Sequence, residues 1–503
     1  FHRAAAEQVA GATVFELSAL VDKSLLRPID DRYQMHELLV QYAREKLDEY
    51  PDEREQMRLA HSRYFTRYLQ EHETKLQRGP DSQFDRVIRE IENIRAAWQY
   101  ALDTGNVEDV NRSLRAMYQI FDVQSNFTEA EEMFNRAVRR LRMLPAPETD
   151  LVIARAQALQ AGCDFRMDRY AEVDRLMNEA LPVLEAYHAD WEIRFCLVML
   201  GRSAAARGDY RQAEARYSQA LSLIEAAGDM SALANVLLRL ASAETMLGNY
   251  NQARDYLNRG QMVIAESGEK FSQMYFHIIR GDLSVRLGRY AEAQADFEEA
   301  LRLSTELDSR NNRAMILADL AQALIALGEL DRARALCQQS IERNEELHNR
   351  WGIAYGLLFL GRAELASGDA EAAANHFTRG IAVCESAGIR TTLAALLRRR
   401  ASALIALDRL PEARNDLQKA LQTAVNSEIP PLILEALAGF VELHEAQGEH
   451  EDAVRLAARI EQHPAAAHQT RLVAQRFLSS DSSQPDGPAY DLNDVVALYL
   501  KAV

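Results

Sequence analysis

The sequence contains little cysteine, with four residues in a chain of 503. No two of them form a Cys-x-x-Cys pair, and histidines do not gather near them. A disulfide framework needs dense cysteines and a zinc site needs paired Cys and His ligands, so this spacing argues against both. We therefore expect buried, reduced thiols and no metal site. The four residues are Cys163, Cys196, Cys337 and Cys384.

Long basic runs and long apolar runs are also missing. The longest basic run is Arg398-Arg399-Arg400, in a chain whose formal net charge of −17 repels nucleic-acid backbones. The best apolar stretch, residues 314–327, is interrupted by Asp319 and Gln322 and is shorter than the ~18 residues of a membrane span. No signal peptide follows Phe1. We expect neither nucleic-acid nor membrane binding, and a fragment of a larger cytoplasmic protein.

No catalytic motif is present. Residues 356–361 have the outline of a phosphate-binding loop but lack its lysine and the following Ser or Thr. We find no Ser/His/Asp or Cys/His arrangement and no paired carboxylates on a pocket-forming loop. We therefore expect no enzyme, no catalytic residues, and no cofactor bound by this part of the protein.

An internal repeat is present instead. Gly208-Asp209-Tyr210 recurs as Gly248-Asn249-Tyr250 and Gly288-Arg289-Tyr290, and the same phase runs from Asp168 to Gly448. A period of about 40 residues indicates a solenoid. A further breaker at residues 228, 268 and 388 divides the unit into two amphipathic helices.

Small residues recur at fixed positions within each unit. One precedes the turn by seven residues, an alanine follows it by five, and a third small residue follows it by twelve. Because these residues are small, two helix backbones can approach closely, and large apolar residues between them fill the core. The alanines after the turn are Ala213, Ala253, Ala293, Ala333, Ala373, Ala413 and Ala453.

These spacings resemble the tetratricopeptide repeat over about residues 154–470. The small residues at positions 8 and 27, the alanine at 20 and the aromatic at 24 match. The family's Trp at position 4 is mostly Leu here, and the family's unit is shorter, at about 34 residues. The resemblance implies an all-α fold, a right-handed α-α superhelix of helix pairs with a binding groove.

The repeat phase also predicts the domain organisation. We expect eight repeats over residues 151–463, helical linker and degenerate repeats over 81–150, and a C-terminal helix, linker and tail over 464–503. In that tail, residues 479–488 are expected to be a linker and 492–500 a last short helix.

The first eighty residues follow a different pattern. Residues 4–10 and 14–22 favour two short helices, and the alternating residues around Asp30-Asp31 predict a β-hairpin. An amphipathic helix follows, with Leu38, Leu39 and Tyr42 inward. This order predicts a winged-helix domain over residues 1–80.

The strings at 20–26, 33–39 and 42–47 resemble the winged-helix segment of STAND NTPases, the class that includes apoptosis-type ATPases and plant NLR immune receptors. Met35-His36-Glu37 matches the family's Met-His-Asp motif, with Glu in place of Asp. The resemblance implies that His36 approaches the β-phosphate of bound ADP. It also implies a nucleotide-binding domain before Phe1, with ADP or ATP as its cofactor.

The inner wall of a tetratricopeptide groove comes from the first helix of each pair. Aromatic and Arg side chains at its inward positions are common binding anchors, which favours a ligand with an anionic or aromatic part. The alternative is that these side chains form salt bridges between neighbouring helices. The predicted groove residues are Phe195, Arg202, Asn235, Tyr275, Asp282, Gln322, Tyr355, Arg362, Arg398 and Ser402.

Three functions fit these patterns. The first is the ligand-sensing, autoregulatory region of a STAND-type signalling NTPase, which binds a protein, peptide or small-molecule inducer and forms a homo-oligomer on activation. The second is a stand-alone scaffold for protein complexes. The third is a DNA-binding regulator that uses the winged helix, although its candidate reading helix, residues 15–24, offers only Lys23 against Glu16 and Asp22.

Overall fold

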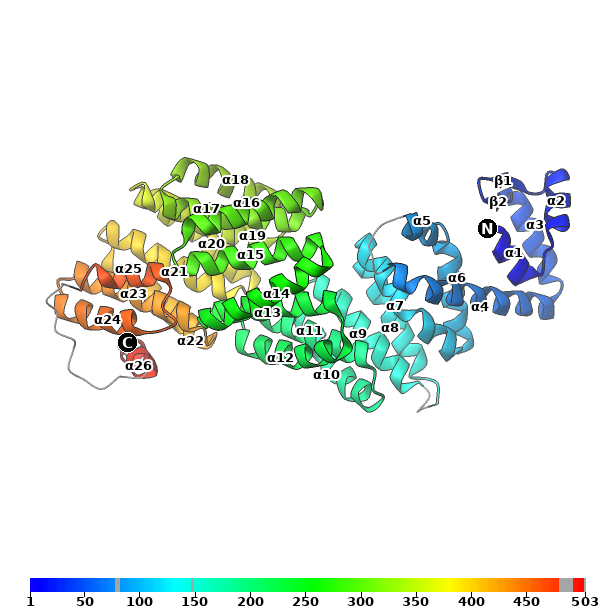
Figure 1. Cartoon of the computed structure of the whole chain (residues 1–503), viewed down its shortest axis with the longest axis horizontal. Coiled ribbons are helices and arrows are strands. Elements are labelled where there is room, and N and C mark those ends of the chain that lie inside the picture. Colours follow the sequence, from blue (N-terminus) through cyan, green and yellow to red (C-terminus); the bar gives the residue numbers. More distant parts are fainter. Residues whose placement is uncertain (77–81, 146–148, 479–491, 502–503) are drawn as a thin grey trace. The chain divides into compact units, whose positions relative to one another are not determined.

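The computed structural model describes residues 1–76, 82–145, 149–478 and 492–501. This part of the chain is built from helices and one two-stranded hairpin (Figure 1). It divides into an N-terminal unit, Phe1–Leu200, and a C-terminal unit, Gly201–Val503, with the border inside helix α11 (Asp190–Ala206). The prediction of an all-α superhelix of paired helices is confirmed. None of the helices in the described part is both long and apolar enough to cross a membrane.

The N-terminal unit begins with the predicted hairpin between short helices. Strands β1 and β2 pair antiparallel, with Arg27 opposite Gln34, and Asp30 takes a positive φ of 54° in the turn. Thr13 starts the second helix with a capping box to Glu16. The hairpin is therefore confirmed, while the winged-helix assignment stays a prediction. The expectation that Leu38 and Tyr42 face inward is wrong, because these side chains are 69% and 58% exposed and α3 buries none of its residues. The elements are α1 (Arg3–Ala10), α2 (Val14–Asp22), β1 (Arg27–Ile29), β2 (Arg32–Gln34), α3 (Glu37–Asp48) and α4 (Pro51–Leu76).

Helices fill the rest of the N-terminal unit. Trp98, Phe121 and Phe134 are buried in its core, and Gly105 ends one helix in the left-handed conformation. The expected domain boundaries near residues 80 and 150 stay predictions. The helices are α5 (Ser82–Ile88), α6 (Ile91–Thr104), α7 (Val107–Gln124), α8 (Phe127–Leu141), α9 (Asp150–Arg166) and α10 (Tyr170–Ala186), followed by the start of α11.

The C-terminal unit is an array of helix pairs, coloured green to red in Figure 1. All four cysteines of the chain, two in each unit, are buried. The last short helix is present as α26, whereas the expected linker at 479–488 lies outside the described residues. The helices are α12 (Tyr210–Ala227), α13 (Met230–Leu247), α14 (Tyr250–Ser267), α15 (Lys270–Arg286), α16 (Tyr290–Glu306), α17 (Arg310–Leu327), α18 (Leu330–Glu346), α19 (Arg350–Ala366), α20 (Ala370–Ala387), α21 (Arg390–Ala406), α22 (Leu410–Asn426), α23 (Pro430–Ala446), α24 (His450–Gln462), α25 (His468–Gln475) and α26 (Leu492–Lys501).

A residue with positive φ stands at every twentieth position from 168 to 448. Such a residue ends a helix, because its N–H turns back to the last free carbonyls. The turns of the predicted motif are every second member of this series. The members between them include the predicted breakers at 228, 268 and 388, and also non-glycine residues such as His188, His348 and Glu428.

The close packing of each helix pair depends on matched side-chain sizes. A Cβ at Gly201, Gly281 or Gly361 would lie 2.5 to 2.6 Å from the aromatic ring that stands sixteen residues later. In the intervening repeats alanine takes the glycine position, and a smaller side chain, Leu or Cys, takes the aromatic position. Where leucine takes the aromatic position, the sum of the two volumes is therefore roughly kept, as a dense core requires.

We expect Gly361→Ala to lower the free energy of unfolding by about 1–3 kcal/mol, because the added methyl would overlap the ring of Phe377. Gly260→Ala is the matched control. It lies within α14, and its Cβ would meet no atom nearer than 3.5 Å, so this variant should gain roughly 0.5–1 kcal/mol. Urea unfolding of both variants measures the difference. Equal shifts would show that the ring contact does not require glycine.

Candidate ligand cavity

The first helix of each pair in the C-terminal unit contributes to the wall of a cavity of about 370 Å³. These helices are α13, α15, α17, α19, α21 and α23. Side chains at positions i, i+4 and i+7 of each helix face it, as expected for one helical face. They form three rows, and successive members of a row come from successive repeats. The rows are Tyr275, Met315, Tyr355, Ala395 and Glu435; Arg239, Ile279, Asp319, Phe359 and Arg399; and Ser242, Asp282, Gln322 and Arg362.

The cavity is partly enclosed, because the C-terminal unit returns on itself. Nη2 of Arg390 donates a hydrogen bond of 3.5 Å to the carbonyl of Arg207. A Cβ at Gly208 would lie 2.7 Å from Thr391. The first turn of the unit therefore contacts the start of α21, and Tyr210 and Thr391 both line the cavity.

The chain between α24 and α25, together with the first residues of α25, covers part of the cavity. We call this stretch, residues 463–469, the closing segment. Its Ala465 carbonyl accepts a hydrogen bond of 3.1 Å from the Tyr250 hydroxyl. The His468 ring lies 6.1 Å from that of Tyr290, and Oε1 of Gln469 accepts a hydrogen bond of 3.1 Å from Arg362. Ala467 and Gln469 line the cavity, so the segment forms part of its wall.

An aromatic ladder runs along the inner face of α19. The rings of Trp351 and Tyr355 stack at 4.8 Å, and Phe359 meets Tyr355 edge-on at 4.8 Å. Arg362 continues the same face one turn later, with its guanidinium 5.1 Å from the Phe359 ring. These four residues lie about one turn apart on one face of α19, so they form an aromatic strip that ends in a cation.

Charged groups of both signs face the cavity. Arg286 lies 3.6 Å from Asp282, and Arg399 lies 3.5 Å from Glu435. Burial alone would raise the pKa of Glu435, but the neighbouring arginines, Arg399 first, lower it below its usual range. Burial and then Arg399 lower the pKa of Arg362 to about 9.

An acidic group stands beside the aromatic ladder. The Tyr355 hydroxyl donates a hydrogen bond of 2.8 Å to Asp319. Burial raises the pKa of Asp319 to about 7, and the hydrogen bond from Tyr355 offsets only part of this effect. Near neutral pH this carboxyl group therefore carries a proton for part of the time.

The predicted groove residues separate into two sets. Tyr275, Asp282, Gln322, Tyr355 and Arg362 line the cavity. That they bind a ligand stays a prediction.

The other predicted groove residues are placed elsewhere among the described residues. Phe195 stacks on Trp191 in the N-terminal unit. Asn235 accepts a hydrogen bond from Arg239, and Arg398 is buried and pairs with Glu442 at 3.2 Å. Arg202 and Ser402 do not line this cavity; Ser402 donates a hydrogen bond to Glu442. The Arg398 salt bridge joins neighbouring helices, as the alternative expects, while Arg398 and Ser402 also line an adjoining cavity of about 220 Å³. That either of them binds a ligand stays a prediction.

Sequence reasoning missed several residues that line the cavity, among them Arg239, Arg286, Trp351, Arg399 and Glu435. The second of the three rows is at i+4, which is the Arg399 position, whereas the family phase placed this row one residue earlier. The Trp-x₃-Tyr-x₃-Phe-x₂-Arg spacing from residue 351 to 362 could have been read as one helical face. No local signal marks the closing segment.

His36 caps a helix. Its Nδ1 accepts a hydrogen bond of 3.3 Å from the backbone N–H of Leu38 at the start of α3. Its role toward ADP stays a prediction.

The N-terminal unit holds a second, polar cavity of about 730 Å³. Arg115 stacks over Trp191 at 4.0 Å and pairs with Glu73 at 3.3 Å, while Arg155 pairs with Glu192 at 2.9 Å. These arginines already have carboxylate partners, so the cavity wall is a salt-bridge network.

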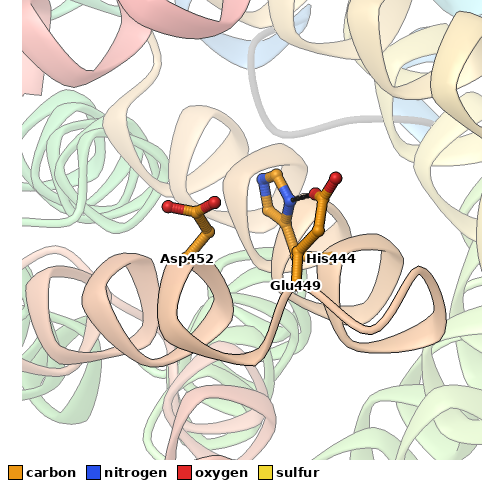
Figure 2. Close-up of side chains that lie close together, drawn as sticks. All are labelled: His444, Glu449 and Asp452. Atoms are coloured by element: carbon orange, nitrogen blue, oxygen red, sulfur yellow. Dashed lines mark hydrogen bonds and ion pairs between the residues drawn. The ribbon is translucent and has the colours of Figure 1, made fainter.

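His444, Glu449 and Asp452 gather near the end of the array (Figure 2). Nδ1 of His444 pairs with Glu449, and its Nε2 lies 3.1 Å from the Tyr499 hydroxyl of α26. Both ring nitrogens are therefore engaged, and the two carboxylates are exposed. We assign this cluster to the attachment of α26 and not to a metal site.

Comparison with known proteins gives one family match. The family described as tetratricopeptide repeat matches residues 192–261 and 277–346. No curated protein matches the chain.

Several solved structures are similar at low identity. A STAND protein with a tetratricopeptide repeat sensor from Pyrococcus horikoshii is 11% identical with a TM-score of 0.37, over 95% of this chain and 60% of its own length. A Rap protein complexed with competence and sporulation factor is 12% identical, with a TM-score of 0.45 over 69% of this chain and 99% of its own. A Rap conjugation gene regulator in complex with the Phr* peptide is 16% identical, with a TM-score of 0.47 over 76% and 99%. These scores are too low to carry an argument about function.

We expect Asp319→Asn to flatten the pH dependence of stability. With a folded-state pKa of about 7, the folded chain keeps a proton that the unfolded chain releases above pH ~4. The free energy of unfolding of the wild type should therefore fall as pH rises from ~4 to ~7, and the variant should lose this contribution. Urea unfolding at pH ~5 and pH ~8 measures it. Asp331→Asn, at a fully exposed side chain, is the control and should behave as wild type.

Proposed function

Because the chain carries tetratricopeptide repeats whose inner faces enclose a cavity, we propose that it is the ligand-sensing and protein-interaction region of a STAND-type signalling NTPase. In this proposal the chain is not catalytic by itself. The observation that carries it is the cavity wall, which is completed by the closing segment of the same chain. A ligand that binds there changes the contacts of this segment and so favours one conformation over another.

The enclosure favours a sensor over a scaffold. A scaffold holds extended partners in an open groove, whereas this groove is covered where Tyr250 and Arg362 hold the closing segment. The occupant is accordingly a small molecule or the tip of a peptide, and its binding is coupled to movement of the protein.

Exposed apolar side chains on the N-terminal helices support the proposal that another domain contacts them. Phe15 is 88% exposed, Leu38 is 69% exposed and Tyr42 is 58% exposed, which is unusual for large apolar side chains on short helices. Their surface is apolar and not basic, so it fits a protein neighbour better than DNA. In the proposal that neighbour is a nucleotide-binding domain that precedes Phe1, and ADP or ATP is its cofactor. The active state is a homo-oligomer in the cytoplasm.

The proposed sensing function predicts that the closing segment controls nucleotide release in the full-length protein. We expect Gly288→Ala to loosen the segment, because the added Cβ would lie 2.4 Å from the His468 ring. Gly328→Ala is a close control: its φ of 83° is similar to the 78° of Gly288, but its Cβ would meet no atom within 4 Å. Hydrogen exchange should rise over residues 463–475 in the first variant only, and ADP release should quicken with it.

The same release rate in both variants, with exchange raised in only one, would contradict the proposed coupling. Unchanged exchange in Gly288→Ala would show that the segment is held by its other contacts.

His36 gives the second test in the full-length protein. We expect His36→Ala to weaken ADP retention about tenfold or more, since a charge-assisted hydrogen bond contributes roughly 1.5–3 kcal/mol. His36→Asn separates sensing from capping, because Asn caps a helix as well as any residue but lacks the imidazole. The amount of ADP that copurifies with each variant is the measurement. Retention restored by Asn would leave His36 with a capping role only.

A further inference from the structure

Arg362 differs from the other arginines around Glu435 in its partner. Its Nη2 donates to the neutral amide oxygen of Gln469 at 3.1 Å. Within the described part of the chain, no carboxylate lies within ion-pair distance of its guanidinium. The neighbouring arginines each have one: Arg286 with Asp282 at 3.6 Å, Arg398 with Glu442 at 3.2 Å and Arg399 with Glu435 at 3.5 Å.

A buried cation in a partly enclosed cavity is costly without an anion beside it. The amide of Gln469 offers a dipole and no charge, while Arg399 adds like charge nearby. Burial and the like charge of Arg399 lower the pKa of Arg362, and the charge of Glu435 offsets only part of this effect. An anion placed against Arg362 would therefore gain both a fork of N–H donors and a surplus of positive charge.

The surface next to this cation is aromatic. Phe359 lies under the Arg362 guanidinium, and Tyr355 and Trp351 follow at one-turn intervals. Flat rings pack on such a strip in offset or edge-on contact. The anion position and the aromatic strip therefore belong to one helix, α19, and one ligand can contact both.

The size of the cavity limits the ligand. Its volume of about 370 Å³ is at the lower end of the usual range for small-molecule sites, roughly 300–1,000 Å³. A folded partner or a long peptide does not fit within it.

We propose that the cavity binds a small aromatic anion, an aromatic ring joined to one carboxylate or phosphate group. The anionic group lies against Arg362 and Arg399, and the ring lies along Phe359 and Tyr355. This inference rests on the proposed sensing function and names its ligand class. Because Gln469 holds the position that the anion takes, binding also releases the closing segment from Arg362.

Calorimetric titration of the purified chain tests the proposal with three matched probes: naphthylacetate, naphthyl phosphate and the uncharged naphthylacetamide. We expect at least one anion to bind about tenfold or more tightly than the amide. Arg362→Gln should abolish that preference, and Arg362→Lys should keep part of it as a point charge. Arg302→Gln, at an exposed position on α16, should leave all affinities unchanged. The stronger of the two anions identifies the carboxylate or the phosphate as the natural group.

Equal binding of anions and amide, or a preference that survives Arg362→Gln, would overturn the anion site. No binding of any probe at millimolar concentration would overturn it too. Neither result bears on the coupling between the closing segment and ADP release. The sensing function is tested separately, by the comparison of Gly288→Ala with Gly328→Ala. Thermal melting of each variant separates lost binding from lost folding.

Discussion

A left-handed residue at every twentieth position is the constraint on which the repeat array depends. It ends each helix from α9 to α23 at almost the same length, so every helix presents the same face at the same phase. An ordinary L-residue adopts this conformation at a cost of about 1–2 kcal/mol, and glycine adopts it freely. The cost is met where packing holds the flanking helices, which explains why His188 and Glu428 serve at the same phase as Gly228.

Constant helix length has a consequence for the C-terminal unit. Successive pairs repeat the same step, and the array turns until α21 meets the turn at Gly208. A superhelix that returns on itself changes a groove into a cavity. The segment after α24 covers part of its opening. Side chains inside this cavity interact in a medium of lower dielectric constant than water, which is why the charges of Arg362 and Glu435 influence one another.

The sequence predicts the repeat well because its signals are local. The turn motif places the starts of helices at Tyr210, Tyr250 and Tyr290, as observed, and Asp30 marks the hairpin. The phase of the family's shorter unit misplaces one row of the inner face by one residue, since Arg399 lines this cavity and Arg398 does not. Contacts between distant positions could not be predicted. Tyr250 and Ala465 are 215 residues apart, and nothing near either residue indicates the other.

The repeats differ from one another at the positions that face the cavity. Packing positions are nearly constant: alanine follows each turn, and glycine meets an aromatic ring or alanine meets a smaller side chain. The inward row, by contrast, reads Tyr275, Met315, Tyr355, Ala395 and Glu435, and the next row is as varied. Helix packing alone would be satisfied by the same residue in every copy. A wall that is acidic, aromatic and cationic in different places is suited to an asymmetric ligand with distinct ends, whereas a repetitive partner would favour a repetitive wall.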